Sequence, residues 1–205
     1  MSTSLHYQSP IVLHHCCSCN IDISKPISIK GVNFGAIYDA SNHIFAVKDK
    51  IIIKFNSKSY QLEEYHFHVP GEHDINGKIY DAEVHYVFVQ LKRGEKHIPI
   101  DYVCKNICNC GEHSTDVLYD RNIFVIGRAI SSNCKCVDLA EIQPEVPSCY
   151  YMYDGSLTTG NFAPVRWIVG DEPIHLNLDE IKKYAKDARP LQELDGRIVL
   201  FTENC

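Results

Sequence analysis

The sequence predicts a β-dominated, mixed α/β fold, and three observations support that prediction. Isoleucine outnumbers leucine by 23 to 12, and β-branched residues suit a pleated sheet better than a helix. Apolar residues gather in short runs bounded by turn formers, and only one segment has helical periodicity. With 205 residues, 45% of them hydrophobic, the chain can bury a sizeable core. We therefore expect one domain over residues 1–205.

The expected elements follow one another as strands, with one helix near the C-terminus. The strands are expected at 43–47, 50–55, 60–69, 78–91, 122–130, 165–169 and 197–201. The helix is expected to begin after Asn177, because Asn177 and Glu180 have the spacing of a capping box. It should run to the stop at Pro190. Residues 92–120 are rich in cysteine, charge and turn formers, so we expect a long cysteine-rich insertion there.

Charge and cysteine usage limit the partners and the compartment. The net charge of −6 argues against nucleic acid as a partner, because no phosphate-seeking surface is expected. Residues 1–13 lack the pattern of a signal peptide, and no apolar run could span a bilayer. Adjacent cysteines such as Cys16 and Cys17 cannot easily bridge each other. We therefore expect a cytoplasmic protein with reduced cysteines and no membrane span, of undetermined oligomeric state.

Three histidines fall on one face of an expected hairpin. Side chains alternate between the faces of a strand, so His66 and His68 point the same way. Asn76-Gly77 is a strong hairpin signal, since a type I′ turn needs positive φ at both central residues. An unbroken ladder centred on that turn places His85 directly opposite His68, and an even number of inserted residues would keep both on one face.

Three imidazoles without a fourth protein ligand are typical of a catalytic zinc site, whose open position holds water. Bound Zn²⁺ lowers the pKa of that water to about 7. Glu83 precedes His85 by two residues on the same face, where it could accept a ring N–H and fix the tautomer. The alternative is that His66 and His68 are partly buried histidines without a metal. The third histidine in register and the flanking acids favour the metal site.

Several motifs, in order along the chain, resemble the α-carbonic anhydrases. They are Gln8-Ser9-Pro10-Ile11, His66-Phe67-His68, Glu72-His73, Ala82-Glu83-Val84-His85, Tyr153-Asp154-Gly155-Ser156-Leu157-Thr158-Thr159 and Val165-Arg166-Trp167-Ile168-Val169. The resemblance extends to about residue 199. It implies a large twisted, mostly antiparallel sheet with a few short helices. It also implies a zinc lyase that reversibly hydrates CO2 to bicarbonate and a proton.

Carried over residue by residue, the resemblance implies Zn²⁺ on the three histidines of the hairpin. Thr158 would orient the zinc-bound oxygen by donating to Glu72, and the backbone N–H of Thr158 or Thr159 would steady bicarbonate. His43 would relay protons to solvent, and Glu64 replaces the family's glutamine beside the first ligand. The residues expected to form the apolar wall that receives CO2 are Val87, Val125, Leu157, Val165 and Trp167.

Each of these roles has a plainer alternative. The apolar wall could be ordinary core packing, and His43 could be an exposed loop histidine. Glu72 could be a surface carboxylate beside a turn, and Thr158 could cap a strand end. The chain also departs from the family after Thr158-Thr159, where Gly160-Asn161 replaces two prolines. Phe162 stands at the expected place of one cysteine of a disulfide found in extracellular members.

Two further hypotheses remain open. Cys104, Cys108, Cys110 and His113 have the composition of a structural Cys3His zinc site, which Cys134 and Cys136 could complete in another way. The alternative is that these cysteines are scattered thiols. The second hypothesis is a catalytically silent binding or adhesion module on the same fold, since function depends on the site and not on the fold.

Overall fold

A large twisted sheet organises the chain, which confirms the predicted β-dominated fold class. The computed structural model describes residues 7–21, 27–31, 35–55, 58–91, 121–133 and 137–202. The described strands of the large sheet are β2 (Cys19–Ile21), β3 (Ser28–Lys30), β4 (Ala36–Asp39), β5 (Ile44–Val47), β6 (Ile52–Phe55), β7 (Lys58–Val69), β10 (Ala82–Gln90), β11 (Ile123–Ser132), β12 (Tyr150–Ser156), β13 (Pro164–Gly170), β14 (Ile174–Leu176), β15 (Lys186–Asp187) and β16 (Val199–Thr202). Most neighbours are antiparallel, but β11 runs parallel to β13.

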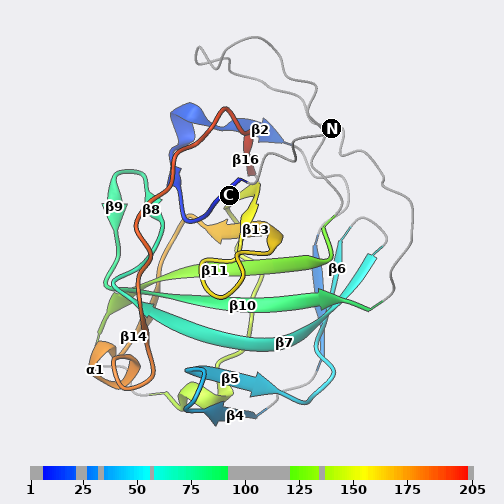
Figure 1. Ribbon diagram of the computed structural model, residues 1–205, viewed down its shortest axis with the longest axis vertical. Coiled ribbons are helices and arrows are strands. Elements are labelled where there is room, and N and C mark those ends of the chain that lie inside the picture. The colour runs from blue at the N-terminus through cyan, green and yellow to red at the C-terminus, as the bar shows by residue number, and fades with distance from the viewer. Residues whose placement is uncertain are drawn as a thin grey trace.

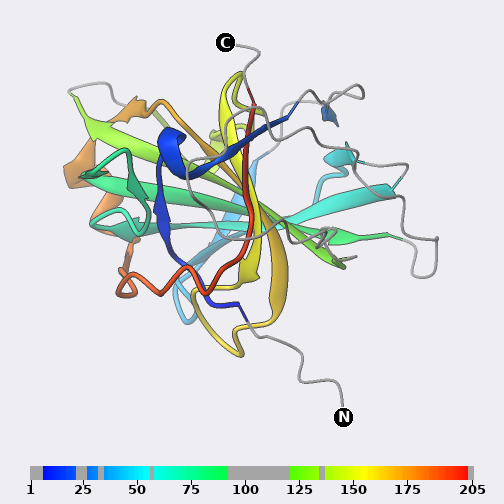
Figure 2. The ribbon, with the colours of Figure 1, turned by 90° about the horizontal axis from the view of Figure 1, so that it is seen from above.

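The sheet runs in the order β2-β16-β12-β13-β11-β10-β7-β5-β4, and the long strands β11, β10 and β7 lie side by side within it (Figure 1). Seen from above, β12 and β13 cross the direction of β7 and β10, which shows how strongly the sheet twists (Figure 2). A second, small sheet contains β1 (Val12–Leu13), β8 (Asp74–Ile75) and β9 (Lys78–Ile79). The short 3-10 helices of the described chain are η1 (His15–Cys17) and η2 (Leu139–Glu141).

The expected strands exist with shifted ends, and the longest of the strands that were not expected lies inside the sheet. The stretch 78–91 is interrupted at Tyr80-Asp81 and forms β9 and β10. That longest unexpected strand is β12, which pairs with both β13 and β16. It lacks polar alternation because all seven of its residues are buried. A strand buried on both faces gives no period-two signal in the sequence.

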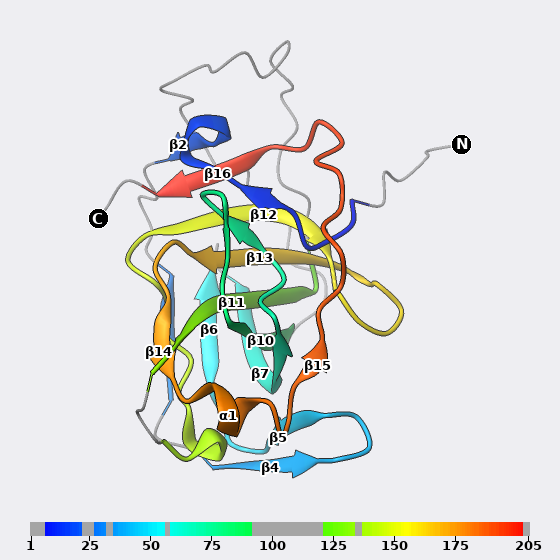
Figure 3. The same ribbon diagram turned by 90° about the vertical axis from the view of Figure 1, so that its left-hand side faces the viewer.

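The predicted helix begins as expected but is much shorter. The side chain of Asn177 accepts hydrogen bonds from the backbone N–H groups of Asp179 and Glu180, so the predicted cap is confirmed. The helix α1 (Leu178–Ile181) then ends, and the expected extension to Pro190 is wrong. Instead, β15 joins the sheet beside β7 in parallel (Figure 3). Hydrogen bonds to the sheet and to the histidine site outweigh the local helical pattern.

The sheet separates two hydrophobic cores. One face carries the larger core, to which β7 and β10 contribute Phe67, Val84 and Tyr86. The other face carries a smaller core that includes Val125 and Trp167. Because alternate residues face opposite ways, the three histidines of β7 and β10 lie on the face of the smaller core.

The cysteines are only partly described. Cys149 is disulfide-bonded, so the expectation of reduced thiols is wrong at this position. The spacing argument excludes bridges between adjacent cysteines, but it says nothing about cysteines that are distant in sequence and close in space. The expectation of a cytoplasmic location loses that support. The insertion at 92–120, with Cys104, Cys108, Cys110 and His113, lies outside the described residues, as do Cys134 and Cys136.

Among the described residues, no helix has the length and apolar character needed to cross a membrane.

Candidate metal centre

The antiparallel pair β7 and β10 brings the three predicted histidines together. His85 pairs with His66, and Glu83 pairs with His68, so the predicted opposition of His85 and His68 is wrong by two residues. The Asn76-Gly77 turn is present with positive φ at both residues, and it joins β8 to β9. Four residues (70–73) precede that small hairpin but only two (80–81) follow it, which shifts the register. The shift is even, so all three histidines still share one face.

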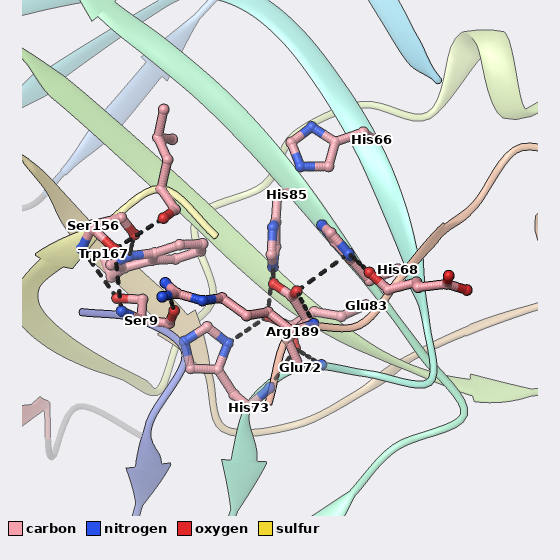
Figure 4. A network of polar contacts seen from close by, with 12 residues as sticks. Ser9, His66, His68, Glu72, His73, Glu83, His85, Ser156, Trp167 and Arg189 are labelled. Carbon is pink, nitrogen blue, oxygen red and sulfur yellow. Dashed lines mark hydrogen bonds and ion pairs between the residues drawn. The ribbon is translucent and has the colours of Figure 1, made fainter. Parts of the chain in front are cut away.

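The three imidazoles form a tight, buried cluster. One ring nitrogen from each of His66, His68 and His85 lies within 4.8 Å of the corresponding nitrogens of the other two. The ring centroids are 5.1 Å apart for His66 and His68, and 4.8 Å apart for His68 and His85. The exposed fractions of these residues are 3%, 0% and 1% in chain order. Figure 4 shows the rings gathered around a common space.

Each ring turns one nitrogen outward to an oxygen of the protein. His68 Nδ1 lies 3.1 Å from the carbonyl oxygen of Asp187. His85 Nε2 lies 2.9 Å from Glu83 Oε1, as predicted for that carboxylate. His66 Nδ1 lies 3.2 Å from Glu64 Oε1, a contact distance without hydrogen-bond alignment. Because carbonyl and carboxylate oxygens only accept, these contacts assign the ring protons of His68 and His85 to the outward nitrogens.

The inward nitrogens fit a metal ion. His66 Nε2 and His68 Nε2 are buried and have no hydrogen-bond partner within the described part of the chain. Leaving two polar atoms buried and unpaired is costly, and such groups call for an explanation. With Nδ1 of His85 they make a set of three imidazole nitrogen donors, which suits Zn²⁺. The residues present therefore fit a resident zinc ion.

Glu83 is the hub of the surrounding hydrogen bonds. Its Oε2 accepts from the backbone N–H groups of Glu72 and His73, each at 2.9 Å. Its Oε1 lies 2.6 Å from His73 Nδ1 and 2.9 Å from His85 Nε2. Gly127 on β11 leaves room for this carboxylate, since a Cβ there would lie 3.0 Å from Glu83 Oε1. A carboxylate with both oxygens hydrogen-bonded thus holds Nε2 of His85 and fixes the orientation of the ring.

Sequence reasoning assigned no role to three residues that extend this network. His73 Nε2 lies 2.7 Å from the hydroxyl of Tyr153, and that hydroxyl donates to Ser9 Oγ at 3.0 Å. All three side chains are buried. Trp167 packs against the rings of both His73 and His85, with centroids 5.0 and 4.8 Å away. These residues lie far apart in sequence, so local patterns could not place them together. Their presence in the family motifs was the only sequence signal for a shared site.

Burial and neighbouring charge set the pKa values of the cluster. Burial lowers the pKa of His66 well below its usual value, and burial with the charges of the other histidines lowers that of His68 to about 2. Both rings are therefore held neutral, which is the form that binds metal. Burial opposes a charge on His85, but the hydrogen bond and charge of Glu83 raise its pKa. Burial likewise opposes the charge of Glu83, yet the charge of His73 lowers its pKa well below the usual value.

Glu72 and Thr158 are both buried, as the predicted orienting pair requires. Glu72 Oε1 accepts from the backbone N–H of Arg189 at 2.8 Å and lies 3.3 Å from His68 Nδ1. Glu72 Oε2 lies 3.8 Å from His85 Nε2 and is buried without a hydrogen-bond partner in the described structure, so it can accept a hydrogen bond. Thr158 follows the end of β12 by two residues. The predicted hydrogen bond between Thr158 and Glu72 is not formed here and stays a prediction.

The segment after α1, which the sequence assigned to a helix, borders the site. Lys186 pairs with His68 across β15 and β7, and the carbonyl of Asp187 meets the ring of His68. Burial lowers the pKa of Lys186, while the charges of Glu64 and Glu72 act in the opposite direction. Burial raises the pKa of Glu64. Lys186 therefore lies near the carboxylates of Glu64 and Glu72 beside the cluster, and no sequence motif predicted this.

The remaining predicted residues lie in three places. His43 is exposed at the turn between β4 and β5, where Nδ1 is 3.1 Å from the hydroxyl of Tyr38. Thr159 is half-buried in the loop after β12. The residues predicted to line the CO2 wall all belong to the smaller core, namely Val87, Val125, Leu157, Val165 and Trp167. Trp167 contacts the ring of His85, so part of this apolar wall adjoins the cluster.

Fold and cluster together define a β-sheet protein with a buried three-histidine cluster that could hold a metal ion, and known proteins offer a comparison. No family model matches the chain. The chain is 26% identical over 160 residues to a carbonic anhydrase of Pectobacterium atrosepticum, covering 71% of this chain and 59% of that relative. It is 29% identical over 203 residues to carbonic anhydrase Nec1 of Nesocodon mauritianus, covering 87% of this chain and 72% of the relative.

Solved structures show the same fold. An α-carbonic anhydrase from Thermovibrio ammonificans, in complex with sulfanilamide, matches with a TM-score of 0.67 and 24% identity, covering 95% of this chain and 86% of that one. Dioscorin complexed with ascorbate matches with a TM-score of 0.73 and 20% identity, covering 98% of this chain and 87% of that one. Relatives named carbonic anhydrase at 26% and 29% identity support the α-carbonic anhydrase family for this chain, and solved α-carbonic anhydrases share its fold.

Proposed function

We propose that the protein reversibly hydrates CO2 to bicarbonate and a proton, as a carbonic anhydrase (carbonate dehydratase) with zinc on His66, His68 and His85. The observation that carries the proposal is the convergence of the three ring nitrogens within 4.8 Å. Nε2 of His66 and Nε2 of His68 are also buried without a hydrogen-bond partner in the described residues. Carbonic anhydrase relatives support the activity at the level of the family. The chain spans 59% of the length of the Pectobacterium relatives. The proposed activity therefore rests on the residues of this chain's own histidine cluster.

The zinc ion, when bound, supplies a Lewis acid that makes a water molecule acidic near neutral pH. The chain's own groups prepare the site. Asp187 and Glu83 hold the outward sides of the His68 and His85 rings by hydrogen bonds, and Glu64 contacts the outward side of His66, so the opposite nitrogens are left for a metal. Glu72, held by the N–H of Arg189, would accept a hydrogen bond from the Thr158 hydroxyl through Oε2, which has no hydrogen-bond partner among the described residues. That hydrogen bond would orient the Thr158 hydroxyl toward the reacting oxygen.

Substrate and proton would use different sides of the site. CO2 is apolar and needs little beyond a dry wall, which Val125, Val165 and Trp167 would provide. The proton would leave through an exposed imidazole, and His43 is the proposed relay. We also propose that residues 1–205 form one domain, which is supported by the pairing of β2 with β16 near the two ends of the chain.

The test is stopped-flow CO2 hydration on protein of measured zinc content, with sulfanilamide as inhibitor. We expect one zinc ion bound per histidine cluster and CO2 hydration that sulfanilamide inhibits. The variant His85→Ala should lose zinc and hydration together, while His175→Ala, an exposed histidine on β14, should keep both. If the fully zinc-loaded protein shows no CO2 hydration that sulfanilamide inhibits, the proposed enzyme activity is rejected. That result would favour the alternative, a catalytically silent binding module on this fold.

A further inference from the structure

The loop that carries Thr158 holds an unusual backbone conformation. It joins β12 to β13, and the N–H of Leu157 donates to the carbonyl of Ala163 at 2.9 Å to close it. Within the loop, Gly160 has a φ of 69° and Phe162 a φ of 51°. Glycine adopts positive φ freely, but an aromatic residue does so rarely and only where its surroundings hold it there. The conformation of Phe162 therefore needs a partner outside the loop.

That partner is Arg189, on the segment that follows β15. Its guanidinium carbon lies 4.2 Å from the centre of the Phe162 ring. The guanidinium cannot turn freely, because Nη1 donates to the carbonyl of Ser9 at 2.7 Å and Nη2 to Gln8 Oε1 at 3.0 Å. Both bonds use the edge of the planar group and leave its face for the ring. Phe162 is 42% exposed, so its contact with Arg189 is not a consequence of deep burial.

The same residue contacts the carboxylate beside the histidines. The backbone N–H of Arg189 donates to Glu72 Oε1 at 2.8 Å, and Figure 4 shows Arg189 inside the polar network around Glu72. Arg189 thus binds Glu72 through its main chain and the Thr158 loop through its side chain. One residue therefore contacts both Glu72 and the loop that carries Thr158.

We propose that Arg189 and Phe162 form a clasp that positions Thr158 relative to Glu72. The clasp rests on the proposed function, in which Glu72 accepts a hydrogen bond from Thr158. It gives the loop an anchor at a point where Gly160-Asn161 supplies none of the rigidity that two prolines would. Phe162 is a positioning residue in this scheme, because it holds the loop of Thr158 and the Thr158 side chain is the group that acts at the reacting atoms.

The experiment compares Phe162→Leu, which keeps an apolar side chain without a π face, with Phe162→Tyr, which keeps the ring. The first measurement is amide hydrogen exchange at Leu157, whose N–H closes the loop. An exposed cation–π contact of ordinary strength predicts exchange about two to five times faster in Phe162→Leu and near wild type in Phe162→Tyr. Equal exchange in all three proteins would overturn the clasp.

The second measurement is CO2 hydration by the zinc-loaded variants. We expect kcat and kcat/KM of Phe162→Leu to fall together by about two to five times, with zinc content unchanged, because Thr158 acts in the transition state. A double-mutant cycle with Arg189→Met should be non-additive, and strict additivity would count against the contact. If the wild-type protein hydrates no CO2, the proposed function fails, while hydrogen exchange at Leu157 still decides the clasp.

Discussion

The substitution Glu83→Gln tests the centre of the candidate metal site. Glu83 receives two backbone N–H groups on Oε2 and two imidazole nitrogens on Oε1. A glutamine has the same shape, but its amide nitrogen is a donor and must face one of those pairs. If it faces the backbone, two hydrogen bonds to a charged acceptor are lost. If it faces the imidazoles, His85 must move its proton to Nδ1, the nitrogen proposed to bind zinc.

Either orientation has a measurable cost. Two lost hydrogen bonds to a charged group correspond to roughly 3–6 kcal/mol in the free energy of unfolding of the metal-free protein. Loss of an outer carboxylate that fixes a ligand histidine lowers metal affinity by about 10- to 100-fold. Urea unfolding measures the first quantity, and competition with a zinc chelator measures the second.

The matched control is Glu63→Gln, because Glu63 is an exposed glutamate on β7, the strand that carries two of the histidines. It should leave both quantities unchanged within about 0.5 kcal/mol. If Glu83→Gln unfolds at the same urea concentration as the wild type and competes equally for zinc, then Glu83 does not hold the site as argued.

Three further changes probe the surroundings of the site. Gly127→Ala should lower the free energy of unfolding by about 1–3 kcal/mol through overpacking against the buried carboxylate, as measured by urea unfolding. Gly35→Ala, with no atom within 4 Å of the added Cβ, should not show that loss. Hydrogen bonds from the next residues lower the pKa of Asp39 to about 2, so its contribution to stability is present above the usual value of 3.8 and is lost as pH falls toward 2. Asp39→Asn should therefore be less stable than Asp49→Asn at pH 7, and a difference that persists at pH 2 would contradict this. His43→Ala should lower turnover without loss of zinc and recover with added imidazole, whereas unchanged turnover would remove His43 from the proton path.

The sequence predicted the histidine site well because strand alternation is a local property. His66 and His68 had to share a face once β7 was a strand, whatever packed against it. The Asn76-Gly77 turn then ensured that His85 returned beside them. The error of two residues in register did no harm, because only an odd shift moves a side chain to the other face.

Local patterns failed where long-range contacts decide the conformation. Ala185 and Ala188 fit a helical face, yet the turn after α1 gives way to β15, which borders the histidine cluster. The hydrogen bonds from the ring of His68 to Asp187 and from the N–H of Arg189 to Glu72 hold it there. Both partners lie more than 100 residues away, beyond the reach of any local propensity.

The sequence by itself determined the β-rich fold, the shared face of three histidines and the outer role of Glu83. Each of these follows from period-two alternation or from a short turn, which neighbouring residues specify on their own. Only the tertiary structure decided that His73, Tyr153 and Ser9 extend the network and that Arg189 joins Glu72 to Phe162. Those contacts connect segments distant in the chain, because buried polar groups take their partners from whichever strand the fold brings beside them.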